Sequence, residues 1–209
     1  MSLKCFTIWA ALAVCIFAVH ATAQKNELSG MLGRTLISDR RISGAPSYDP
    51  DLRFGDGLTF ELNYARRLMG SELLSLSLEV PFVVNADDDL HAAQNLIPKQ
   101  YSSYFVTPAA RVNLFPDQAV SPWVSLGGGL GHFGASSTLE FGNLPNLGKT
   151  GTNTGVLQVG FGLDVRLYKH FTLRGELREF WSGEPQLNVI TSSSRQANHF
   201  VAGGVVWKF

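Results

Sequence analysis

The stretch His199–Phe209 reads His-Phe-Val-Ala-Gly-Gly-Val-Val-Trp-Lys-Phe, and it decides the fold of this chain. Successive side chains of a β-strand point to opposite faces, so every second residue shares a face. Phe209 shares one face with four residues, which are Trp207, Val205, Gly203 and Val201. The other face carries Lys208 and mainly small residues. An apolar strand face that ends in two aromatic rings indicates the closing strand of a membrane barrel, because lipid covers the face and closure removes the free edge.

The N-terminal residues have the pattern of a secretory signal. Lys4 precedes an apolar run over 5–19, and Ala21-Thr22-Ala23 is typical of a cleavage site. The sequence therefore predicts a cleaved signal peptide over 1–23 and one mature domain over 24–209. An uncleaved N-terminal anchor is the alternative. Both cysteines, Cys5 and Cys15, lie in the predicted signal peptide, so we expect neither disulfides nor a thiolate metal site in the mature protein.

Short segments in the mature chain alternate apolar and polar residues with period two, which is typical of strands with one apolar face. Eight such segments are expected, at about 27–37, 56–67, 72–84, 102–115, 121–133, 154–167, 171–181 and 199–209. The alternation is clearest where Leu74, Leu76 and Leu78 oppose Ser75 and Ser77.

The connections between these segments have two lengths that alternate strictly. Three are tight turns (Arg67–Ser71, Pro116–Val120 and Tyr168–His170) and four are long loops (38–55, 85–101, 134–153 and 182–198). Outer-membrane barrels have short periplasmic turns and long external loops. The sequence thus predicts an all-β, eight-stranded, antiparallel, up-and-down transmembrane β-barrel. A soluble eight-stranded barrel with its apolar face inward is the alternative.

The sequence also predicts departures from regular strand structure at three positions, and two belts of aromatic residues around the barrel. We expect Pro81 to lie near a strand end, Pro108 to mark a bulge, and a bulge near Gly33 to resolve the position of Arg34 among leucines. The aromatic residues near strand ends are expected to form two interfacial girdles. They are Tyr64, Tyr104, Phe115, Trp123, Phe133, Tyr168, Phe171, Trp181, Trp207 and Phe209.

From Glu27 to Phe209 the chain resembles the small outer-membrane β-barrel family typified by the OmpA transmembrane domain and OmpX. The resemblance implies export to the outer membrane, contact with outer-membrane lipid and lipopolysaccharide, and insertion by the barrel-assembly machinery. Alternate residues of the last strand resemble the C-terminal signal that this machinery recognises. They are Val201, Gly203, Val205, Trp207 and Phe209.

Charged residues on the polar faces form the candidate site. They are Glu61, Glu79, Arg111, Asp164, Arg166, Arg174, Glu176 and Arg178. The lumen of an eight-stranded barrel is just wide enough for side chains, and buried charges must pair. We therefore expect a self-neutralising ion-pair network that fills the lumen, in a protein with a structural or surface-interaction role. A narrow channel lined by the same charges is the alternative.

Other functions have weaker support in the sequence. A lipid-modifying barrel enzyme is a third possibility, because the lipid A 3-O-deacylase family also carries a histidine on its last strand. Its serine follows two residues later, where this chain has Val201 after His199, so we expect no catalytic residues. Asp87-Asp88-Asp89 lacks the spaced ligands of a calcium loop, and we expect no metal or cofactor. The formal net charge of zero predicts no nucleic-acid partner, and an extracellular ligand of the loops stays open.

Overall fold

The computed structural model describes residues 25–55, 57–92, 97–142, 144–191 and 194–209. The predicted signal peptide lies outside these residues. No helix in the described part of the chain is long and apolar enough to cross a membrane. The strands are β1 Asn26–Ile37, β2 Arg40–Arg41, β3 Asp51–Phe54, β4 Leu58–Gly70, β5 Leu74–His91, β6 Gln100–Val106, β7 Ala109–Leu114, β8 Val120–Ala135, β9 Gly151–Arg166, β10 Phe171–Gly183 and β11 Arg195–Lys208.

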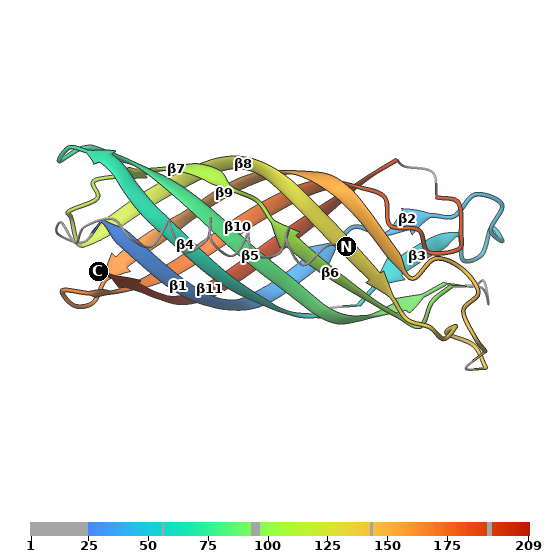
Figure 1. The fold of residues 1–209 in the computed structure, drawn as a ribbon. Helices are drawn as coiled ribbons and strands as arrows, with labels where there is room; N and C mark the ends of the chain where they lie inside the picture. The colour runs from blue at the N-terminus through green and yellow to red at the C-terminus, as the bar shows by residue number, and fades with distance from the viewer. Residues whose placement is uncertain (1–24, 56, 93–96, 143, 192–193) are drawn as a thin grey trace, which may run out of the picture.

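Antiparallel pairing closes these strands into an eight-stranded barrel, as the sequence predicts (Figure 1). The circuit runs β1–β4–β5, then through β6 and β7, which together form one barrel strand, and on through β8, β9 and β10 to β11. Pairing of β11 with β1 closes the ring, with Glu27 opposite Lys208 and Ile37 opposite Asn198. Closure pairs the backbone groups of every barrel strand on both sides, which a membrane-spanning sheet requires.

The two ends of the barrel differ in their connections. The end of β11 lies at the same end as the three tight turns, and β2 and β3 lie at the opposite end (Figure 1). The predicted long loop at 85–101 is partly wrong, because β5 continues to His91 and pairs there with β3. The loop end is therefore partly built from strands that project beyond the barrel.

The two prolines meet at a single interruption of the sheet. Pro81 lies in the middle of β5, so its predicted place near a strand end is wrong. Thr107 and Pro108 separate β6 from β7 opposite Pro81, and the Thr107 N–H donates to the Pro81 carbonyl over 3.3 Å. The register toward β5 is the same on both sides of the gap, so the expected bulge at Pro108 is absent. Proline has no backbone N–H to donate to a neighbouring strand. Because Pro81 and Pro108 lie at the same gap, the sheet loses fewer hydrogen bonds than it would with two separate interruptions.

The expected bulge near Gly33 is also absent. The register of β1 is continuous through Gly33 toward both β4 and β11. Glycine is needed here for a different reason: a Cβ would lie 2.1 Å from the Val201 carbonyl oxygen. Gly33 thus allows β11 to approach β1 closely without a bulge, and Arg34 stays on the outer face beside Leu32 and Leu36.

The two faces of the barrel decide between a membrane barrel and a soluble one. The outer face exposes large apolar side chains along every barrel strand, including Leu62, Leu126, Phe161 and Val205. The inner face buries the charged and polar side chains. Water would cover such an exterior only at a high cost in free energy, whereas lipid matches it. The barrel is a transmembrane one.

Candidate functional site

Charged side chains, all buried except the partly exposed Lys208, occupy the half of the lumen nearer the tight turns. They come from almost every barrel strand: Glu27 on β1, Glu61 on β4, Glu79 on β5, Arg111 on β7, Asp164 on β9, Arg174, Glu176 and Arg178 on β10, and Lys208 on β11. We call these nine residues the charged layer. Its members form one connected set of ion pairs, and the following paragraphs describe the pairs from the centre outward.

Arg178 lies at the centre of the charged layer and contacts three carboxylates. Its Nη1 donates to Glu79 Oε1 over 2.8 Å, and neither side chain is exposed. Its Nε lies 3.1 Å from Glu61 Oε2 and donates to Glu176 Oε1 over 3.0 Å. β5 and β10 lie four steps apart in either direction around the ring, so the pair with Glu79 joins opposite walls of the barrel.

Two further arginines connect the layer toward the tight-turn end. Arg174 donates to both oxygens of Asp164, over 2.7 and 2.8 Å, in a bidentate pair. Arg111 binds Glu27 and lies 3.3 Å from Glu79 Oε2. Glu27 also lies 3.5 Å from the Arg174 guanidinium and 3.5 Å from Lys208 Nζ. Each of these buried charges therefore has an opposite charge within contact distance, as burial requires.

Trp123 lies inside the charged layer, so its predicted place in an aromatic girdle is wrong. Its ring centroid is 5.2 to 5.8 Å from the guanidinium carbons of Arg111, Arg174 and Arg178. The indole N–H donates to Asp164 Oδ1 over 3.2 Å. Gly162 makes room for the ring, because a Cβ there would lie 2.6 Å from the indole Cζ2. The ring lies where cation–π attraction adds to the ion pairs.

Seven of the eight predicted site residues lie in the charged layer, and Arg166 does not. Its side chain is exposed at the tight-turn rim, where it donates to the Pro116 carbonyl over 3.1 Å. Glu27 and Lys208 belong to the layer but were absent from the predicted set. A signal for both was available in the sequence. Glu27 lies on the polar face of its strand, since its sequence neighbour Leu28 is on the apolar face, and Lys208 is related to Trp207 in the same way.

An aromatic layer fills the lumen between the charged layer and the loops. Phe105 and Phe180 stack with centroids 4.8 Å apart and planes at 7°. Phe133 packs edge-on against Phe105 at 5.8 Å, so its predicted place in a girdle is also wrong. Tyr101 stacks on Phe133 at 5.7 Å. The lumen thus holds a charged layer and, nearer the loops, an aromatic layer, in which the buried amides of Gln158 and Asn198 lie on the strands beside Phe180.

The loops at the end of the barrel opposite the tight turns continue the aromatic layer outward. Ile42, Leu52, Leu90, Ile97 and Leu187 are buried in the same apolar cluster as the phenylalanines of the lumen. Arg40 fixes the β10–β11 loop, with its Nη1 3.3 Å from Glu184 Oε1 and a hydrogen bond from Nη2 to the Arg195 carbonyl. The loops therefore form a packed cap over the lumen.

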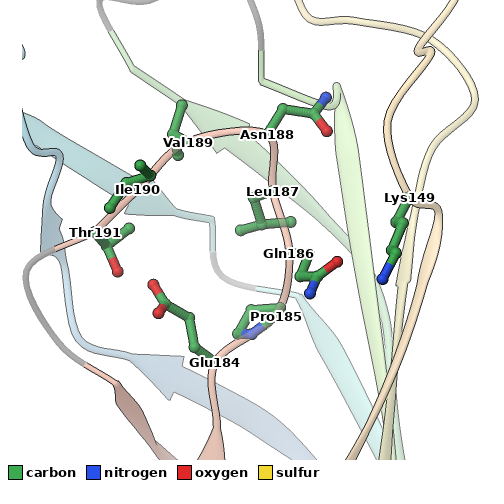
Figure 2. Close-up of a pocket in the computed structure, with 9 residues that line it drawn as sticks. All are labelled: Lys149, Glu184, Pro185, Gln186, Leu187, Asn188, Val189, Ile190 and Thr191. Atoms are coloured by element: carbon green, nitrogen blue, oxygen red, sulfur yellow. The ribbon is translucent and has the colours of Figure 1, made fainter.

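The surface of this cap contains a pocket of about 390 Å³. Residues 184–191 of the β10–β11 loop curve around it, and Lys149 approaches from the neighbouring loop (Figure 2). The pocket carries one basic and one acidic side chain, Lys149 and Glu184, beside the apolar Leu187 and Ile190. Such a lining is suited to a small polar ligand or to a side chain of a partner protein.

The five residues of the predicted assembly signal all lie on the outer face of β11 or just after it, where each is exposed. The Trp207 and Phe209 rings lie 4.6 Å apart at the tight-turn end. In the sequence Asp87-Asp88-Asp89, the side chains of Asp87 and Asp88 are not among those that the structure describes. Among the described residues, no group of three His, Cys, Asp or Glu side chains could hold a metal ion.

The fold of this chain is similar to that of several solved structures. Neisserial surface protein A superposes with a TM-score of 0.56 at 13% identity, over 90% of this chain and 100% of that one. The chain has the fold of the small outer-membrane β-barrels. The outer-membrane protein OprG from Pseudomonas aeruginosa is similar, with a TM-score of 0.51 at 13% identity, over 90% of this chain and 96% of that one. No protein-family model matches the chain, and no curated protein sequence matches it.

Proposed function

We propose that this protein is an integral outer-membrane barrel with a sealed lumen, which serves a structural or surface-interaction role through its external loops. The observation that carries the proposal is the pair formed by Glu79 and Arg178 from opposite walls, 2.8 Å apart. Because this side-chain bridge joins opposite walls, an aqueous path at that level would have to pass around the two side chains. An eight-stranded barrel is also close to the minimum width that side chains fill.

The charged layer and the aromatic layer each support the proposal that the lumen is sealed, for different physical reasons. The charged layer is held by ion pairs that would have to break before an ion could pass, and each break leaves a buried charge unpaired. The aromatic layer above it places the stacked rings of Phe105 and Phe180 across the lumen, and the buried amides of Gln158 and Asn198 beside Phe180 are already held in hydrogen bonds. Function on such a scaffold resides in the loops, where residues 184–191 and Lys149 supply a pocket at the surface of the cap.

Planar-bilayer recordings of the refolded protein test the sealed lumen. We expect no stable conductance steps from the wild-type protein at moderate voltage. Discrete, reproducible steps would overturn the proposal in favour of the narrow channel. Heat-modifiable gel mobility of the same sample verifies that the protein is folded, so an absence of conductance cannot be attributed to unfolded protein.

Location and catalysis have separate tests. Outer-membrane fractionation is expected to recover the protein with the membrane, inserted by the barrel-assembly machinery; recovery in the soluble periplasm would contradict this. The enzyme alternative requires a nucleophile beside His199, and Val201 supplies none. Mass spectra of lipid A from cells with and without the protein should therefore be identical.

A further inference from the structure

The charged layer contains one more acidic side chain than basic side chains. Its acids are Glu27, Glu61, Glu79, Asp164 and Glu176, and its bases are Arg111, Arg174, Arg178 and Lys208. If every group were ionised, the layer would carry one negative charge in excess. An uncompensated charge inside a protein is very costly, so one carboxylate of such a layer is expected to take up a proton or a cation.

Contacts within the layer show where the excess negative charge lies. Three of the four bases can each be matched with one carboxylate that they contact directly. These pairs are Lys208 with Glu27, Arg174 with Asp164, and Arg111 with Glu79. Arg178 is then left with two carboxylates, Glu61 and Glu176, for its single positive charge. The excess charge therefore lies beside Arg178.

Hydrogen bonds distinguish the two carboxyl groups beside Arg178. Glu176 accepts from Nε and from Nη2 of the guanidinium, over 3.0 and 3.2 Å, as an ionised partner does. Glu61 Oε2 lies 3.1 Å from the same Nε, but that nitrogen carries a single hydrogen, which it donates to Glu176. Both Glu61 oxygens are buried, and neither accepts a hydrogen bond. Glu61 is therefore the carboxyl group that the arginine leaves unsatisfied.

The side chains opposite Glu61 supply neither a charge nor a hydrogen-bond donor. They are Met31 on β1 and Val83 on β5, both buried. Among the described residues, the charged groups that face Glu61 are Arg178 and Glu176 on β10 and Glu79 on β5. The Glu61 and Glu176 carboxyl groups lie within hydrogen-bond distance of each other. Two carboxylates have no hydrogen to share, so this contact becomes a hydrogen bond only when one of them carries a proton.

We propose that the charged layer contains a binding site for one proton, held on Glu61, whose hydroxyl donates to the Glu176 carboxylate. One proton removes the excess charge and satisfies Glu61, while Glu176 keeps both hydrogen bonds from Arg178. Neighbouring carboxyl groups in a dry site commonly share a proton in this way. The charged layer is then a pH-sensitive part of the barrel, because loss of the proton puts a second uncompensated carboxylate beside Arg178.

Infrared spectroscopy detects the proton directly, because a neutral carboxylic acid has a carbonyl stretch that an ionised carboxylate lacks. The refolded protein is measured at neutral pH in a detergent without ester groups, since lipid esters absorb in the same region. The wild-type spectrum is expected to contain one such band, which shifts in D2O. Exposed Asp and Glu side chains are ionised at neutral pH and add nothing to it.

Three variants assign the band to its residue. Glu61→Gln removes the acid that carries the proton, so the band should disappear. Glu176→Gln should also abolish the band, because the layer then holds equal numbers of acids and bases, and Glu61 can ionise. Glu72→Gln is the control: it removes an exposed carboxyl group from the β4–β5 turn and should leave the band unchanged.

The same proton predicts a pH dependence of stability. Above about pH 5 the unfolded chain releases the Glu61 proton, whereas the folded barrel keeps it. Since the folded state then binds one proton more than the unfolded state, stability falls as the pH rises. The unfolding constant of the wild type, relative to that of Glu61→Gln, should rise about tenfold per pH unit until the folded barrel loses the proton. Urea unfolding of both proteins in vesicles at a series of pH values measures this ratio.

A wild-type spectrum without a carboxylic acid band would overturn the proton site, and so would a band that survives Glu61→Gln. A missing band together with a stability that depends on the concentration of sodium or potassium would show that a cation neutralises the layer instead. The wild-type spectrum decides the matter even if a variant fails to refold. The inference rests on the sealed lumen of the proposed function: conductance steps would overturn the seal, whereas a missing band in a non-conducting barrel would overturn only the proton site.

Discussion

Glu79 on β5 and Arg178 on β10 meet inside the barrel, Oε1 to Nη1 2.8 Å, although their strands lie on opposite sides of the ring. No local pairing of strands brings them together; the whole barrel must close first. Ion pairs of this kind link walls that share no backbone hydrogen bonds. The charged layer should therefore govern the stability of the closed barrel more than that of any single hairpin.

Arg174→Leu should destabilise the barrel by about 3–5 kcal/mol, because it leaves the Asp164 carboxylate buried without its bidentate partner. Both side chains are at most 2% exposed, so water cannot replace the arginine. The free energy of unfolding in urea, measured in phosphatidylcholine vesicles, checks this value.

The double variant Arg174→Leu with Asp164→Leu separates a lost pair from lost packing. Replacing both partners removes the uncompensated charge, so most of the lost stability should return. An Arg174→Leu variant as stable as the wild type would contradict a dry ion pair at this level.

Leu62→Arg tests which face of the barrel meets lipid. Leu62 is 55% exposed in the middle of β4, so an arginine there should cost about 2–4 kcal/mol near the bilayer midplane. Unfolding in phosphatidylcholine vesicles is the measurement, and Leu62→Phe, which stays apolar, should cost little. A neutral Leu62→Arg would mean that water, and not lipid, covers this face.

The sequence was sufficient to predict the strands and their faces because both depend on local pattern. Period-two alternation in β5, with leucines opposite Ser75 and Ser77, determines which side chains face the lumen, and loop length determines the order of the strands. Pairing of acidic with basic residues in the lumen follows from burial alone. These features do not depend on which residues meet across the barrel.

The position of Trp123 could not be predicted in the same way. An aromatic residue near a strand end usually lies in an interfacial girdle. Here the ring turns inward because Gly162 on the neighbouring strand leaves space and three arginines from two other strands surround it. Both conditions involve residues distant in sequence. The role of Gly33 is similar, since it leaves space for the close approach of β11, which is distant from β1 in sequence.

Gly162→Ala should destabilise the barrel by about 1–3 kcal/mol through overpacking. The added methyl group would lie 2.6 Å from the buried Trp123 ring and 2.5 Å from the Gly175 carbonyl oxygen, which belongs to the backbone of the paired strand. Gly175→Ala is the matched control, because a Cβ there has no heavy atom within 4 Å. Urea unfolding followed by tryptophan fluorescence measures both; equal stabilities would show that the lumen is looser than the contacts indicate.

Phe209→Ala should reduce assembly in cells several-fold while leaving the stability of the refolded barrel within about 0.5 kcal/mol, as for an exposed side chain. Alanine keeps the two backbone hydrogen bonds that join Phe209 to Asn26, so closure itself is preserved. Phe171→Ala removes a similarly exposed aromatic at the same level, opposite Trp207, but outside the proposed assembly signal. Surface-exposed, heat-modifiable protein is measured for both variants in cells, and urea unfolding in vesicles. If the two variants lose assembly equally, the loss comes from the interfacial girdle and not from recognition of the last strand.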